Sequence, residues 1–136
     1  MKAPPVLLPG PSPVAALVLG WLIPGGGHAY AGRWGKAILF FVLITGLLVA
    51  GVAIGGGAVV LPNRLWFIAQ FCAGGPAIAL TPICQYFATR AAIDWADRFH
   101  EMGTLYTAVA GLLNLLVMMD AYLRLAYPER EAQEDA

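Results

Sequence analysis

The chain has 136 residues, of which 60% are hydrophobic and 12% are charged, and its mean hydropathy is +0.72. Eight basic and eight acidic side chains leave no net charge, which argues against a nucleic-acid partner. A barrel is disfavoured because its strands need an alternating pattern rather than long apolar runs. The composition therefore predicts an all-α polytopic membrane protein, in which each crossing segment satisfies its own backbone polar groups.

One membrane domain is expected over residues 14–127, between a proline-rich N-terminal arm and a polar acidic tail. The arm covers residues 1–13 and the tail residues 128–136. Four apolar segments are predicted inside the domain, three or four of them crossing the bilayer: 14–27, 36–61, 65–89 and 103–127. An amphipathic helix over residues 88–102 is expected at the membrane surface, because its apolar and charged residues separate at helical spacing.

The first apolar run, residues 14–23, is only about 15 Å long as a helix, half the hydrocarbon thickness. It is either a re-entrant helix or a span completed through the glycines that follow. This run and Ala29-Tyr30-Ala31 together mimic a signal peptide with its cleavage site, but the proline-rich start disfavours that interpretation.

A glycine-rich connection, residues 24–36 with the sequence PGGGHAYAGRWGK, joins the first two segments. Glycines permit tight turns, and tyrosine and tryptophan suit the headgroup level of a membrane. We expect a structural role for the residues of its recurring pattern, which are Pro24, Gly25, Gly27, His28, Tyr30 and Gly32. The second segment carries Gly51 and Gly55, a small-residue pair that permits close helix packing.

The third segment, residues 65–89, admits two arrangements. Gly74-Gly75-Pro76 makes it either one kinked span, which its 25 uncharged residues favour, or a hairpin of two half-helices. In the favoured arrangement, His28 and Asp120 lie near opposite membrane faces and are too far apart to pair. In the hairpin arrangement, they lie on the same side. Gln70 and Gln85 either bridge helices or face an exposed end.

The last segment combines a stripe of small and polar residues with one embedded acid. Gly103, Thr107, Ala110 and Asn114 fall on one side at helical spacing and predict a helix seam. Asp120 is four residues before Arg124, which predicts an ion pair, although an acid at this depth is also a candidate for proton or ion handling. Cys72 and Cys84 are expected to be free packing residues.

Residues 21–32 contain the pattern W-L-x-P-G-x-G-H-x-Y-x-G. This pattern resembles that of a family of small, uncharacterised bacterial membrane proteins related to the two-transmembrane-domain superfamily. The final stretch, GTLYTAVAGLLNLLVMMDAY, is similar to the end of the same family and includes Gly111, Asn114 and Asp120. The resemblance implies no activity. We expect a multi-pass protein of the bacterial inner (cytoplasmic) membrane.

The expected function is non-catalytic, an accessory or scaffolding subunit of a larger membrane complex, with the lipid bilayer and other membrane-protein subunits as partners. No catalytic residue, metal ligand set or cofactor is predicted, since the chain has no CxxC, HExxH or acidic cluster with ligand spacing. The alternative is a small transporter or channel that uses Asp120 and Asn114. A third hypothesis is a haem or quinone site that uses His28 and His100.

Overall fold

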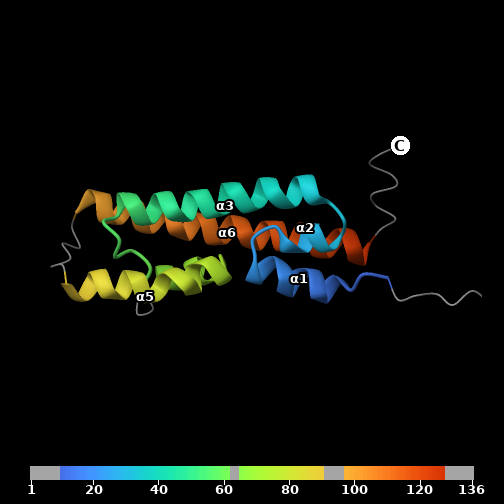
Figure 1. Cartoon of the computed structure of the whole chain (residues 1–136), viewed down its shortest axis with the longest axis horizontal. Coiled ribbons are helices and arrows are strands. Elements are labelled where there is room, and N and C mark those ends of the chain that lie inside the picture. Colours follow the sequence, from blue (N-terminus) through green and yellow to red (C-terminus); the bar gives the residue numbers. More distant parts are fainter. Residues whose placement is uncertain (1–9, 62–64, 91–96, 128–136) are drawn as a thin grey trace, which may run out of the picture.

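The computed structural model describes residues 10–61, 65–90 and 97–127, and every regular element in these ranges is a helix. The helices are α1 (Pro13–Leu22), α2 (Gly26–Tyr30), α3 (Trp34–Ile54), α4 (Trp66–Phe71), α5 (Gly75–Arg90) and α6 (Arg98–Ala126) (Figure 1). The predicted all-α class is confirmed for this part of the chain. The acidic tail and most of the N-terminal arm lie outside the described residues.

The two long helices, α3 and α6, run antiparallel side by side (Figure 1). Both are long and apolar enough to cross a membrane, with 21 and 29 residues. Close packing at one end depends on glycine: a Cβ on Gly51 of α3 would lie 2.7 Å from Thr107 Cγ2 and 2.8 Å from the Gly103 carbonyl oxygen of α6. The predicted small-residue surfaces of these helices therefore face each other.

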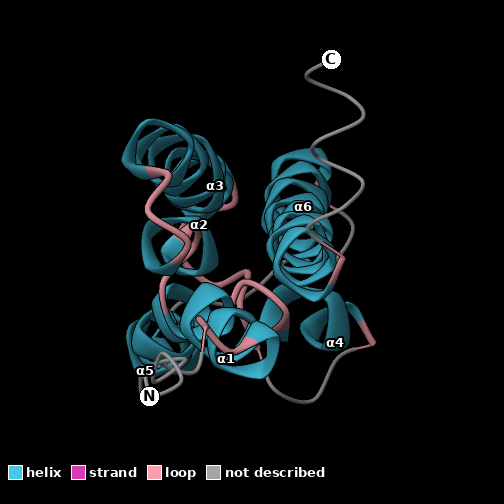
Figure 2. Ribbon diagram, turned by 90° about the vertical axis from the view of Figure 1, so that its right-hand side faces the viewer, coloured by secondary structure: helices cyan, strands magenta, loops and turns pink. Residues whose placement is uncertain are grey.

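A helical hairpin made of α1 and α2 packs beneath one half of this pair (Figures 1 and 2). After α1 the chain reverses at Pro24 and Gly25, which has a φ of 81°, a value that glycine adopts without steric cost. The short helix α2 then returns to the level at which α1 began, where the Ser12 N–H donates a hydrogen bond to the Tyr30 hydroxyl oxygen at 3.3 Å. The first segment is therefore a hairpin of two helices rather than one continuous helix.

The third segment is also a hairpin, so the single kinked span favoured by its sequence is wrong. Helix α4 ends at Phe71, the chain turns at Gly74 with a φ of 68°, and α5 begins at Gly75. The break is stable because Gly74 tolerates the left-handed conformation, and because Pro76 sits in the first turn of α5, where a missing N–H costs nothing. This hairpin packs beneath the other half of the pair (Figure 1).

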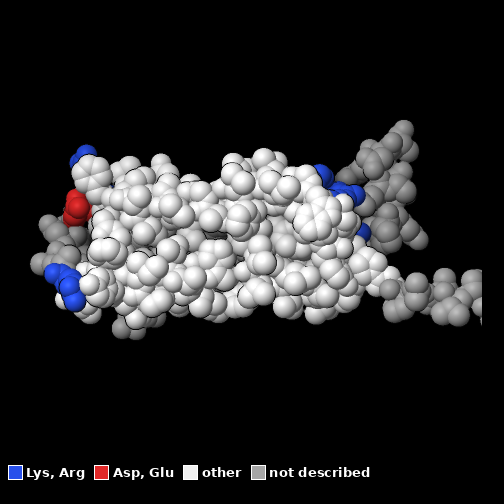
Figure 3. Space-filling view, viewed as in Figure 1, with Lys and Arg blue, Asp and Glu red and all other residues white. Residues whose placement is uncertain are grey.

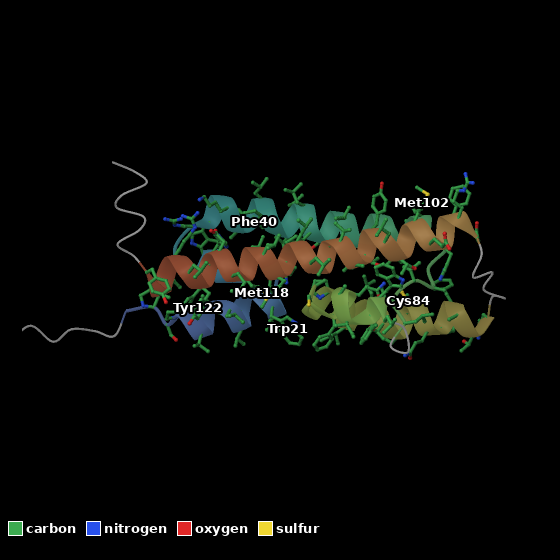
Figure 4. The ribbon with its side chains drawn as sticks, turned by 180° about the vertical axis from the view of Figure 1, so that it is seen from behind. Trp21, Phe40, Cys84, Met102, Met118 and Tyr122 are labelled. Carbon is green, nitrogen blue, oxygen red and sulfur yellow. The ribbon has the colours of Figure 1, made fainter. Side chains whose placement is uncertain are left out.

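The two hairpins meet midway along the molecule, where α1 ends and α5 begins (Figures 1 and 4). Gly74 and Gly75 pack against the carbonyl groups of Trp21 and Leu22 so closely that a Cβ at either glycine would overlap them. The Trp21 indole N–H donates to the Phe71 carbonyl oxygen at 3.1 Å. Because α1 and α5 run in the same direction, the negative end of one helix dipole faces the positive end of the other. Together they form one end-to-end pair of helices from segments about fifty residues apart in the sequence.

Large apolar side chains cover the outside of this bundle, whereas its interior combines alanines and glycines with a few larger apolar side chains, such as Leu48, and a few polar residues. Only 22% of the apolar window of α3 and 39% of that of α6 is buried, unlike the core helices of a soluble domain. In the view of Figure 3, lysine, arginine, aspartate and glutamate occupy the two ends and leave a broad uncharged band between them. This distribution matches a bilayer environment.

The amphipathic helix predicted over residues 88–102 is not one continuous helix. Arg90 ends α5, and Asp97 is an extended N-cap whose carboxylate accepts a hydrogen bond from the Phe99 N–H at 3.2 Å. An aspartate before a helical run is a strong N-cap, so a new helix starts here and continues into the last apolar segment. The intervening residues 91–96 lie outside the described part of the chain.

Candidate functional site

The most concentrated polar contact joins the glycine-rich connection to the end of α6. His28 Nε2 lies 2.9 Å from Asp120 Oδ2, and the Arg124 Nε–H donates to both carboxylate oxygens at 2.9 and 2.8 Å. The expectation that His28 and Asp120 are too far apart is therefore wrong. They meet because the third segment turns back, which brings the end of α6 to the level of α2. The predicted pair of Asp120 with Arg124 is present.

The His28 ring is held from two sides and is only 1% exposed. Its Nδ1 has no hydrogen-bond partner among the described residues, and the Phe40 ring packs edge-on at a centroid distance of 5.1 Å. An imidazole with its proton on Nε2 can donate to the carboxylate and leaves only a lone pair on Nδ1. The other tautomer would bury an unpaired N–H. The geometry therefore fits a fixed, structural histidine.

The glycines of the pattern lie where the chain has no room for a side chain. A Cβ on Gly27 would lie 2.5 Å from the Ala16 carbonyl oxygen and 2.9 Å from Ala121 Cβ, and one on Gly25 would overlap the Ala37 carbonyl. Gly32 has open space but a φ of 78°, so its conformation selects glycine. Of the remaining pattern residues, Pro24 is buried and Tyr30 is 41% exposed.

Asn114 is placed at the junction of the two hairpins, near the middle of α6. Its side-chain amide donates to the Gly20 carbonyl oxygen at 3.2 Å and to the Cys72 carbonyl oxygen at 2.9 Å. Both are carbonyls at the ends of short helices, which lack partners within their own helix. One buried side chain thus satisfies the free ends of two half-helices that enter from opposite ends of the molecule.

The rest of the predicted seam faces the same interior. Gly103, Thr107 and Ala110 are buried, whereas Leu105, Leu112 and Leu116 on the other side of α6 are exposed.

Gln70 shares this interior, although the sequence left its position open. Its amide donates to Thr107 Oγ1 at 2.7 Å and to the Val59 carbonyl oxygen at 3.0 Å. A lone glutamine in an apolar run was the only signal for this bridge. Gln85, the other candidate, is exposed.

The side chains at these positions take part in hydrogen bonds between helices. The described residues contain no group of three or more His, Cys, Asp or Glu side chains that could hold a metal ion, and Cys72 and Cys84 are free thiols. His28 contacts Asp120, whereas His100 lies near the start of α6, so the structure does not bring the two histidines together. The polar groups are arranged to fasten helices to one another.

Comparison with known proteins places the chain in a family. The model of the family of unknown function DUF6677 matches residues 15–132, from the first helix to beyond the last. No curated protein and no solved structure matches the chain. The predicted membership of an uncharacterised family is confirmed: the chain belongs to the family of unknown function DUF6677.

Proposed function

We propose that this protein is a non-catalytic, multi-pass membrane protein that acts as an accessory or scaffolding subunit of a larger membrane complex. The observation that supports the proposal is that the buried polar side chains form hydrogen bonds between helices. Those of His28, Asn114 and Gln70 each join segments distant in the sequence. Such cross-links give a fixed shape and leave the exterior for contacts with lipid and neighbouring subunits.

The proposed membrane topology has α3, α6 and the composite span of α1 and α5 crossing the bilayer. Two half-length hairpins entering from opposite sides fit the rule that irregular backbone occurs at membrane depth only where protein covers it. The connection and both ends of the described chain then lie on one side. This arrangement is consistent with a relation to the two-transmembrane-domain superfamily. We further propose the bacterial inner membrane as the location.

The topology is testable by accessibility labelling of single cysteines in a chain with Cys72 and Cys84 replaced by alanine. An impermeant thiol reagent should reach Gly35→Cys and Tyr127→Cys from one side of the membrane and Arg98→Cys from the other. Labelling of Gly35→Cys and Tyr127→Cys from opposite sides would contradict the hairpin topology.

The scaffold role is testable with a photo-crosslinking residue placed at lipid-facing positions on three elements: Val42 of α3, Ile83 of α5 and Leu116 of α6. All three side chains are at least half exposed. A subunit should give one defined membrane-protein product in high yield from one element and little from the other two. Equal, weak cross-linking from all three would argue against a fixed partner.

A small transporter or channel is the second candidate, because broken helices at membrane depth line transport sites in larger proteins. The observation that favours it is Asn114 Oδ1, a buried acceptor without a partner among the described residues. Flux of ions or protons through liposomes that hold only this protein would support transport. Flux that is equal in protein-free liposomes would leave the scaffold role as the better explanation.

A further inference from the structure

A hollow of about 320 Å³ lies at the end of the molecule opposite His28 and Asp120. It is bordered on one side by the chain before and within α4, with Val59, Leu61 and Trp66, and on the other by the first turns of α6, with His100, Glu101 and Leu105. Of the helix-joining contacts described above, the hydrogen bond from Gln70 to the Val59 carbonyl involves a residue that borders this hollow. The volume of the hollow falls at the lower limit of small-molecule sites, about 300–1,000 Å³.

We propose that this hollow binds a primary ammonium group carried by an apolar chain, as in an aminophospholipid. Glu101 and Trp66 both line this space. A carboxylate can bind an ammonium by charge-assisted hydrogen bonding, and an indole ring can attract it to the ring face. Val59, Leu61 and Leu105 supply an apolar wall for the adjoining chain. The hollow thus offers an amphiphile both a polar and an apolar contact.

The charges around the hollow select a zwitterionic rather than an anionic headgroup. Figure 3 shows both basic and acidic side chains at this end of the molecule. Among the described residues, Arg90 and Arg98 are the cations here, and Asp97 and Glu101 are the acids. Such a mixed set can match the separate charges of a zwitterion. Among zwitterionic lipids, an ethanolamine headgroup can donate N–H hydrogen bonds to Glu101 and a choline headgroup cannot. This site is independent of the proposed scaffold role.

The test is native mass spectrometry of the full chain, released from mixed phosphatidylethanolamine and phosphatidylcholine micelles with matched acyl chains. Bound phosphatidylethanolamine should exceed phosphatidylcholine about tenfold, the ratio expected from one charge-assisted hydrogen bond. Glu101→Gln should weaken this preference, because the amide oxygen still accepts a hydrogen bond but carries no charge. Glu101 is exposed, so its replacement leaves the packing intact. Equal retention of the two lipids by the unmodified chain would overturn the proposal.

A matched pair of variants tests the hollow itself. Leu105 and Leu112 lie two turns apart on α6 and are both 50% exposed, but only Leu105 borders the hollow. Leu105→Trp should fill the space and abolish the lipid preference, whereas Leu112→Trp should retain it. Equal effects would refute the assignment. Competition by soluble glycerophosphoethanolamine would identify a free amine as the ligand, and its failure to compete would identify the lipid.

Discussion

Replacing Asn114 removes the tie between the two hairpins without changing the size of the side chain. In Asn114→Leu, the carbonyls of Gly20 and Cys72 lose donors that lie 3.2 and 2.9 Å away. Hydrogen bonds between helices in membrane proteins contribute about 0.6 kcal/mol on average and up to about 1.7. Two such bonds give an expected loss of roughly 1–3 kcal/mol in the free energy of unfolding. Leucine fills a similar volume, so a cavity adds little.

Two further variants separate the hydrogen bonds from general effects of substitution. Asn114→Asp should destabilise at least as much as Asn114→Leu, because it places a third acceptor against two carbonyl oxygens. Leu116→Ala, on the outer side of α6 and 66% exposed, should cost little stability. The measurement is reversible unfolding in mixed micelles followed by circular dichroism. An Asn114→Leu protein as stable as the unmodified one would refute the reasoning that these bonds hold the junction.

Three other tests follow from the packing and the ion pairs. Gly27→Val should lower the midpoint of thermal unfolding and the yield of folded protein. The valine side chain would overlap the Ala16 carbonyl of α1 and the Ala121 methyl group of α6. Normal yield and stability would contradict this prediction. Ala110→Leu should lower the midpoint of thermal unfolding, because the larger side chain disrupts the packing of the bundle. The neighbouring change Val109→Leu, at a position 38% exposed, should lower it only slightly. Equal midpoints for the two variants would exclude a helix seam at Ala110. A double-mutant cycle of His28→Gln and Asp120→Asn should give a coupling energy of about 1 kcal/mol. The value is small because the Asp120 carboxylate is 41% exposed and also binds Arg124. Additive effects of the two substitutions would show that the contact of His28 with Asp120 contributes nothing to stability.

The sequence was sufficient to predict the features that depend on composition and local pattern. Apolar runs identified the regions of α3 and α6, helical spacing found the stripe through Thr107 and Asn114, and the i, i+4 spacing found the pair of Asp120 with Arg124. The glycine-rich connection was recognised as a tight turn because four glycines precede Arg33. These features are set by neighbours along the chain, so no tertiary information was needed.

The features that the sequence could not settle depend on contacts between distant segments. A run of 25 uncharged residues suits one crossing by its length, but Gly74 fits closely against the end of α1, and that contact favours the turn. The prediction that His28 and Asp120 are too far apart was wrong for the same reason. The path of the third segment decides at which end of the molecule α6 ends, and therefore whether Asp120 lies near His28. The break at Asp97 was missed because the amphipathic pattern continues across it, although aspartate is a common N-cap.

The junction at Asn114 also constrains how the protein is made. The Gly20 carbonyl receives its donor from a residue 94 positions later in the chain, in α6. In the proposed topology, the first hairpin has an unsatisfied carbonyl at membrane depth until α6 has entered the bilayer, which costs free energy in lipid. During biogenesis α1 and α2 should therefore remain at the membrane surface or with the insertion machinery, and take their final depth only after α6 has been inserted.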